Sequence, residues 1–103
     1  MRRSRPVIRQ GENLKVPMFY IYIFLENNSQ LYTGFTADLR QRVKDHNAGK
    51  VESTRDRRPL KLVHYEAYNK ESDARRREKY LKTSEGKHFL KQQIKDFLEE
   101  LNS

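Results

Sequence analysis

The sequence predicts an α+β fold, a small β-sheet of three strands flanked by α-helices, and three observations carry this prediction. An unbroken apolar run at residues 19–25 is followed by polar turn residues and a second short run at residues 31–36. A third run of strand length occupies residues 60–68. Segments with the apolar period of a helix follow the second and third runs, at residues 38–47 and 73–83. A last amphipathic stretch adds a C-terminal helix.

Composition allows one small domain and favours a polyanionic partner. Hydrophobic residues make up 35% of the 103 residues and charged residues another 35%, which is enough for one modest core. The 22 lysines and arginines outnumber the 14 acidic residues and give a net charge of +8. This balance indicates nucleic acid or an anionic membrane surface as partner, and the alternative is that the charge only maintains solubility. The absence of cysteine excludes disulfides, thiolate zinc sites and cysteine nucleophiles.

The sequence contains no membrane or export signal. No apolar run reaches the roughly 18 residues that a membrane helix requires, and no apolar segment follows the N-terminal arginines. We therefore expect a cytoplasmic protein with no membrane partner. Residues 1–17 carry five basic residues and one acid without an apolar period, which predicts a disordered basic arm. The folded domain is predicted over residues 18–85, with Met18 as an alternative first residue of the native product, and the C-terminal helix over residues 86–103.

Residues 19–36 predict a β-hairpin. The first run has no polar residue, which is typical of a strand buried on both faces. Gly34, within the second run, marks a bulge or a close approach of the backbone. Tyr22 and Tyr32 lie on the two strands and can face one site only if they lie opposite each other, which requires a turn with an odd number of residues. An even turn would place the two tyrosines on opposite faces of the sheet.

The first predicted helix carries polar groups on its inward face. Asp38 has the position of an N-cap with Gln41 at capping-box spacing, and Gly49 is a typical C-terminal stop. Taken alone, Arg42 is a side chain whose charged end reaches past the edge of the core, and His46 is a partly buried histidine with satisfied ring nitrogens. At 100° per residue the inward face consists of Leu39, Arg42, Val43 and His46.

The segment between the first helix and the third strand, residues 50–61, contains seven charges, of which five are basic. Such a segment is either a solvated loop or a surface that contacts phosphate groups. Its hydroxyl groups, on Ser53 and Thr54, are also suitable phosphate donors. In the second interpretation the nucleic-acid-binding residues are Arg55, Arg57, Arg58 and Lys61.

The second predicted helix places a carboxylate among apolar residues. Ser72 is a plausible N-cap for this helix. A buried carboxylate is costly unless it is paired, so Glu78 needs an arginine, a tyrosine hydroxyl or a metal ion. The purely structural alternative is a salt bridge from Glu78 to Arg42 or Arg77. The inward face of the helix consists of Ala74, Arg77, Glu78 and Leu81.

The last predicted helix, which ends near residue 101, has an apolar stripe that indicates core or packing surface. The stripe could also pair two copies of the chain as a homodimer. Its members are Phe89, Leu90, Ile94, Phe97, Leu98 and Leu101.

Taken together, these positions resemble the GIY-YIG nuclease superfamily, and in particular its small stand-alone bacterial members. The resemblance extends over roughly residues 18–85. The first triplet here is Tyr-Ile-Tyr instead of Gly-Ile-Tyr, and the second is Tyr-Thr-Gly instead of Tyr-Ile-Gly. The matching positions are Tyr20-Ile21-Tyr22, Tyr32-Thr33-Gly34, Thr36, Leu39, Arg42, His46, Ser53-Thr54-Arg55, Arg57-Arg58-Pro59, Leu62-Val63, Tyr65-Glu66 and residues 77–82.

The resemblance implies a three-stranded antiparallel sheet and a hydrolase that cuts phosphodiester bonds with one divalent cation, Mg²⁺ or Mn²⁺. By position, Glu78 would bind the metal, and Tyr22 would be the general base that activates water. Tyr32 would orient groups at the scissile phosphate, and Arg42 would stabilise the charge that develops on phosphorus. His46 matches a family position whose role is less defined. The expected partner is DNA or RNA, and the expected activity is an endonuclease in DNA repair, recombination or the processing of foreign DNA.

The chemistry of these groups agrees with such roles. A carboxylate that holds Mg²⁺ together with several waters leaves the ion open to phosphate oxygens. A planar guanidinium suits the equatorial oxygens of a pentacoordinate phosphorus. A tyrosine is a poor base at its ordinary pKa of about 10, so it needs a nearby cation. The alternative function is a nucleic-acid-binding module on the same fold that cleaves little or nothing.

Overall fold

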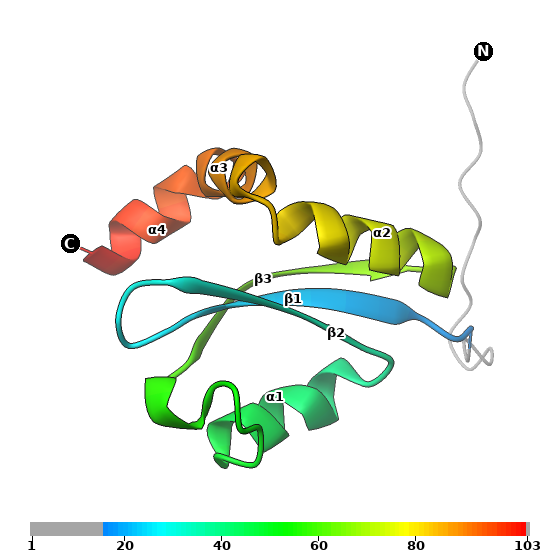
Figure 1. Ribbon diagram of the computed structural model, residues 1–103, viewed down its shortest axis with the longest axis horizontal. Helices are drawn as coiled ribbons and strands as arrows, with labels where there is room; N and C mark the ends of the chain where they lie inside the picture. Colours follow the sequence, from blue (N-terminus) through cyan, green and yellow to red (C-terminus); the bar gives the residue numbers. More distant parts are fainter. Residues whose placement is uncertain (1–15, 103) are drawn as a thin grey trace, which may run out of the picture.

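The computed structural model of the protein describes residues 16–102. Helices cover both faces of the sheet (Figure 1). The predicted α+β class and the three-stranded antiparallel sheet are confirmed. The elements are β1 (Phe19–Leu25), β2 (Leu31–Thr36), α1 (Leu39–Asn47), the short 3-10 helix η1 (Arg55–Arg57), β3 (Lys61–Tyr68), α2 (Glu71–Leu81), α3 (Ser84–Gln93) and α4 (Lys95–Asn102).

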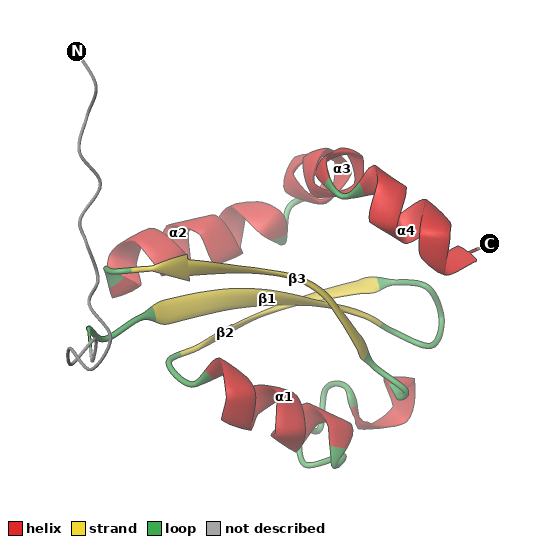
Figure 2. Cartoon of the chain, turned by 180° about the vertical axis from the view of Figure 1, so that it is seen from behind, coloured by secondary structure: helices red, strands yellow, loops and turns green. Residues whose placement is uncertain are grey.

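The strand order is β2-β1-β3, with β1 antiparallel to both neighbours. This central position explains why β1 has no polar residue, because helices cover both of its faces (Figure 2). The hairpin pairs Leu25 with Leu31, so its turn contains the five residues 26–30, an odd number. Tyr22 and Tyr32 therefore share a face as predicted for an odd turn, but they do not lie opposite each other: Tyr32 pairs with Phe24, two residue pairs from Tyr22.

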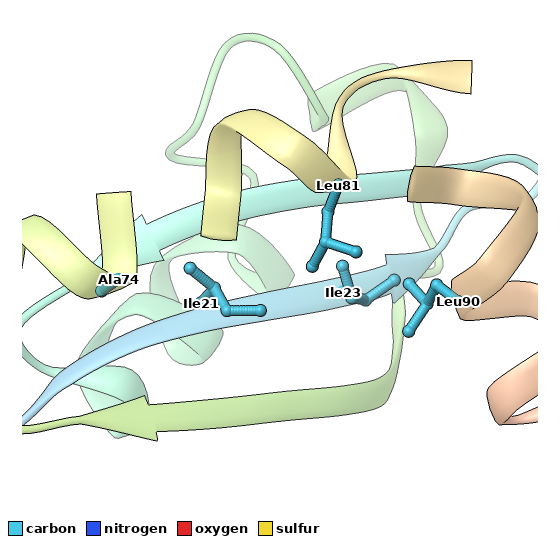
Figure 3. Close-up of a cluster of buried hydrophobic side chains, with 5 residues drawn as sticks. All are labelled: Ile21, Ile23, Ala74, Leu81 and Leu90. Atoms are coloured by element: carbon cyan, nitrogen blue, oxygen red, sulfur yellow. The ribbon is translucent and has the colours of Figure 1, made fainter. Parts of the chain in front are cut away.

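The sheet separates two apolar clusters. The first cluster lies between the sheet and the α2–α3 layer and contains Ile21, Ile23, Ala74, Leu81 and Leu90 (Figure 3). The second cluster lies on the α1 side, and its buried members are Tyr22, Phe24 and Leu60. Alternate residues of β1 supply the two clusters, as the period of a strand requires.

The ends of α1 agree with the sequence prediction, except that the Gln41 side chain donates to Asp45 and does not close a capping box with Asp38. The carboxylate of Asp38 accepts a hydrogen bond from the Gln41 backbone N–H at 3.1 Å. Gly49 follows the helix with φ of 76°, the left-handed conformation that favours glycine, and its N–H donates to the carbonyl of His46. The inward face is also confirmed, since His46 is fully buried and Arg42 is partly buried.

The start of α2 and the course of the last helix differ from the prediction. The N-cap of α2 is Lys70, so Ser72 is not a cap, because the extended backbone at Lys70 begins the helix two residues earlier than expected. The single C-terminal helix is in fact α3 and α4, which are separated at Ile94, whose side chain packs against the first cluster. Within the predicted apolar stripe, Phe89 is 55% exposed and Phe97 is 40% exposed.

The described structure does not test three of the sequence predictions. The basic arm lies outside the described residues except for its last two positions. The division of the chain after residue 85 and the homodimer through the C-terminal helix stay predictions. None of the described helices has the length and apolar character needed to cross a membrane.

Replacing Gly34 with alanine is expected to destabilise the fold by about 1–3 kcal/mol. A Cβ atom at this position would overlap the ring of Tyr22, which is buried against the backbone of β2. Urea denaturation measures the loss, with Ala67→Ser as a control that adds one atom at an exposed strand position. If Gly34→Ala unfolds at the wild-type urea concentration, the close packing of Tyr22 over Gly34 is wrong.

Candidate active site

Two elements, β1 and α1, bring Tyr22, Arg42 and His46 together around one hydroxyl group. Tyr22 is on β1 and only 1% of its surface is exposed. The Nε of Arg42 donates a hydrogen bond to the Tyr22 hydroxyl oxygen at 3.1 Å. The Nε2 of His46 lies 3.0 Å from the same oxygen. Arg42 and His46 reach it together because they are four residues apart on the inward face of α1.

The second ring nitrogen of His46 is also engaged. Its Nδ1 lies 2.7 Å from the hydroxyl oxygen of Thr54, which is fully buried in the segment before η1. A neutral imidazole has one N–H, so His46 donates at one of these two contacts and accepts at the other. Thr54 is therefore a partner of His46, which corrects the expectation that its hydroxyl contacts phosphate.

Tyr32 lies at the edge of this polar cluster. Its ring centroid is 6.5 Å from that of Tyr22 and 5.5 Å from that of His46. The hydroxyl of Ser53 donates to the Tyr32 hydroxyl oxygen at 3.3 Å. Four of the five residues predicted to be catalytic thus form one group on the α1 side of the sheet.

Burial is the main influence on the ionisation of these groups. It raises the pKa of Tyr22, while the hydrogen bond and positive charge of Arg42 act in the opposite direction. Burial also lowers the pKa of His46 to about 4, with a further contribution from the charge of Arg42, so His46 is neutral at pH 7. The side chains of the protein therefore do not by themselves lower the pKa of Tyr22, as a general base requires.

Glu78 is the fifth predicted residue and lies in the other layer, on α2. Its carboxylate is 15% exposed and forms salt bridges with Lys82 at 3.2 Å and with Arg75 at 3.6 Å. Arg75 confirms the expectation of an arginine partner, but the two arginines named for the salt bridge were wrong, since Arg42 donates to Tyr22 and Arg77 pairs with Glu66. Glu78 is nevertheless close enough to the polar cluster for its negative charge to raise the pKa of Tyr22.

The basic segment before β3 has internal contacts that the sequence does not reveal. Arg55 donates from Nε to the carbonyl of Gly49 at 2.9 Å, at the end of α1. Arg58 donates to the carbonyls of Arg55 and Asn47, at 2.9 and 3.4 Å. These hydrogen bonds hold the segment against α1, which places Thr54 beside His46.

The other two predicted nucleic-acid-binding residues, Arg57 and Lys61, differ in their surroundings. Arg57 forms a salt bridge with the buried Glu26 at 3.5 Å. Lys61 is exposed at the start of β3, and its side chain forms no hydrogen bond or ion pair within residues 16–102. Of the four predicted nucleic-acid-binding residues, Lys61 is thus the one whose side chain has no polar partner in the described chain.

Comparison with known families agrees with this geometry. Residues 18–93 match the family model described as the GIY-YIG catalytic domain. This match spans well over half of the 103 residues, so the chain belongs to the GIY-YIG family. The family is one of nucleases, whose substrate is nucleic acid.

Within this family the chain is similar to small stand-alone UPF0213 proteins. A UPF0213 protein of Staphylococcus haemolyticus is 40% identical over 82 residues, which cover 79% of this chain and 94% of that protein. One from Haloquadratum walsbyi is 43% identical over 65 residues and covers 62% of this chain and 73% of its own. The solution NMR structure of a UPF0213 protein from Bacillus halodurans is 34% identical, with a TM-score of 0.48 over 71% of this chain and 81% of that chain.

Acidification is expected to destabilise the protein through His46. Histidine titrates near pH 6.5 in the unfolded chain and at about 4 in the folded protein, so the unfolded state binds more protons between these values. The free energy of unfolding therefore falls as the pH drops from about 7 to 4, by up to about 3 kcal/mol from this residue.

Urea denaturation of wild type and His46→Gln across this pH range isolates the effect, because glutamine keeps hydrogen-bonding groups and does not titrate. The difference in stability between the two proteins should shrink toward pH 4. A constant difference would contradict the burial of a neutral His46. The pKa of Glu66 is also lowered, which changes the free energy of unfolding only near and below the ordinary pKa of a glutamate. This change is the same in both proteins and cancels in their difference.

Proposed function

We propose that this protein is a divalent-metal-dependent endonuclease that hydrolyses phosphodiester bonds in DNA. The observation that carries the proposal is the hydroxyl of Tyr22, which is held between a guanidinium and a neutral imidazole. Burying three such groups together costs free energy that apolar side chains would avoid. A cluster of this kind is typical of a reaction site.

Arg42 is proposed to bind the scissile phosphate and to stabilise its developing charge. Its Nε is used by Tyr22, which leaves the two terminal nitrogens of the guanidinium for phosphate oxygens. The hydrogen bond to Tyr22 also fixes the side chain, so little conformational freedom is lost when the phosphate binds. Electrostatic stabilisation is most effective when the donor is already positioned.

Tyr22 is proposed to take the proton of the attacking water, with His46 as a positioning residue. A phenol that still holds its proton cannot take another, so Tyr22 would act as the phenolate, which a cation nearby would favour. In the tautomer whose Nδ1 accepts a hydrogen bond from Thr54, the Nε2–H of His46 donates to this phenolate oxygen and, with Arg42, keeps it in position. Tyr32, whose hydroxyl oxygen accepts from Ser53, keeps its own proton for a phosphate oxygen.

Glu78 is proposed to hold the divalent ion, Mg²⁺ or Mn²⁺. Within residues 16–102, no group of three or more acidic or histidine side chains is placed to hold a metal ion. The protein would therefore supply one carboxylate. This donor set fits Mg²⁺, which usually keeps several waters and binds one or two carboxylates together with substrate phosphates. Such an ion would polarise the phosphate oxygens, and its charge would offset that of Glu78, which raises the pKa of Tyr22.

The described residues show no element that would read base edges in a groove, so we propose a structure-directed or weakly specific enzyme. The expected context is DNA repair, recombination or the processing of foreign DNA. Phosphate contacts from the basic segment before β3 would supply the binding energy, including one from the exposed Lys61.

A second candidate function is a nucleic-acid-binding module without cleavage. Two observations favour it: Glu78 is already paired with Lys82 and Arg75, and the pKa of Tyr22 is raised. Both would be expected of an inherited site that has lost its metal.

Glu78→Gln and Tyr22→Phe are expected to abolish cleavage while leaving DNA binding within about twofold of wild type. Each change keeps the shape of the side chain and removes one proposed role, the metal ligand or the base. The measurement is cutting of labelled single-stranded, duplex, flap and branched DNAs with Mg²⁺ or Mn²⁺.

The matched control is Glu71→Gln, an exposed carboxylate on the same helix that also pairs with Arg75. This variant should cut as wild type does. Salt-sensitive binding of wild type without cutting of any substrate would reject the enzyme and leave the binding module.

Lys61→Gln is expected to weaken binding of duplex DNA uniformly and to reduce the slope of log K against log salt by about one. Each phosphate contact that is lost removes about one released counterion. The control is Lys91→Gln, an exposed lysine on α3 on the other side of the sheet. A slope equal to that of wild type would exclude Lys61 from the interface.

A further inference from the structure

A hollow opens on the same face of the sheet as Tyr22, between α1 and β3. Its volume is about 580 Å³, which lies within the range of small-molecule sites. Tyr20 and Tyr65 line it from the strands, and Arg40 and Lys44 line it from α1. None of these four residues belongs to the polar cluster of Tyr22.

Tyr65 gives this hollow an exposed aromatic wall. Its ring is 54% exposed, although β3 pairs it directly with the fully buried Tyr22. The ring of Tyr20 lies 6.4 Å away, centroid to centroid, at an angle of 59°. A large apolar ring that stays in water makes little contribution to the core and is available for stacking.

The two cations beside this wall lack partners in the described chain. Arg40 and Lys44 are one turn apart on α1, and neither side chain forms a hydrogen bond or ion pair within residues 16–102. Asp38 also lines the hollow, but its carboxylate is occupied as the N-cap of α1. The hollow therefore combines an aromatic surface with free positive charge.

The hollow on the opposite face of the sheet is a useful contrast. It has a volume of about 510 Å³ and is lined by Tyr68, Tyr80, Arg76 and Arg77. There the arginines are neutralised, since Arg76 pairs with Asp73 at 3.0 Å and Arg77 with Glu66 at 3.0 Å. Of these two hollows, only the one on the α1 side therefore combines exposed aromatic surface with positive charges that pair with no acidic side chain of the described residues.

We infer that the hollow between α1 and β3 receives an unpaired nucleobase of a single-stranded segment. The base stacks on Tyr65, and Arg40 and Lys44 hold the adjoining phosphates. Aromatic stacking with a basic groove is the combination that binds single strands without sequence preference. The inference rests on the proposed function, since it assigns a binding subsite for the same substrate.

The subsite would make unpaired DNA next to the cleaved bond the preferred structure. A duplex keeps its bases stacked inside and offers only phosphates to Arg40 and Lys44. A flap, loop or strand end offers a base to Tyr65 as well. The preference of the enzyme for a DNA structure would then come from this hollow instead of from the Tyr22 cluster.

The test is fluorescence anisotropy of labelled 12-nucleotide strands in the absence of divalent metal, so that no cleavage occurs. One strand is fully base-bearing and the other has abasic positions at its centre. Wild type should bind the base-bearing strand more tightly. Tyr65→Ala should weaken this binding by roughly 5- to 100-fold and bring it to the level of the abasic strand.

Three further variants control this result. Tyr65→Phe keeps the ring and should bind as wild type does. Phe89→Ala removes an aromatic ring of equal exposure on α3 and should have no effect. Arg40→Gln and Lys44→Gln should each reduce the salt slope for single strands by about 0.7.

Two outcomes would overturn the subsite. Tyr65→Ala could bind the base-bearing strand as wild type does, or wild type could fail to distinguish the two strands. The nuclease proposal is judged separately. If binding depends on the base but no DNA is cut, the nuclease is rejected and the subsite is kept. If Tyr65→Ala cuts flap and duplex DNA as wild type does, the subsite is rejected and the nuclease is kept.

Discussion

The buried hydroxyl of Tyr22 is the constraint on which the rest of the site depends. A phenol oxygen removed from water costs free energy unless it is hydrogen-bonded, and Arg42 and His46 both reach it from α1. His46 is itself fully buried, so its second ring nitrogen needs a partner, which Thr54 supplies. Each polar group requires the next one, and this series of contacts runs from the centre of the sheet through α1 to the segment before β3.

These requirements explain local features that apolar packing alone would not produce. The inward face of α1 carries an arginine and a histidine where a helix of a simple core would carry aliphatic residues. Gly34 has no side chain because the ring of Tyr22 occupies that space. Arg55 and Arg58 bind carbonyl groups at the end of α1 and so keep Thr54 beside His46. The basic segment therefore has a structural function in addition to any contact with phosphate.

The fold could be predicted from the sequence because its main signals are local. Apolar run length identified the strands, helical period identified the inward faces, and the odd hairpin turn placed Tyr22 and Tyr32 on one face. The partners of charged side chains could not be predicted, because they depend on tertiary position. Glu66 reaches Arg77 from a strand eleven residues away, which leaves Glu78 to Arg75 and Lys82. The division at Ile94 likewise depends on a contact with the first cluster.

The sheet also separates the first apolar cluster, under α2 and α3, from the polar groups around Tyr22 on the α1 side. Glu78 connects the two layers. Its helix, α2, is held on the sheet by Ala74 and Leu81 of the first cluster. Its charge nevertheless acts on Tyr22 from there, against the charge of Arg42 on α1. Burial raises the pKa of Tyr22 most, and the charges of Arg42 and Glu78, which lie in different layers, act on this pKa in opposite directions. Because α2 is held by apolar packing, Glu78 has a fixed place relative to Tyr22, and the proposed cation, if bound there, would offset its charge and favour the phenolate.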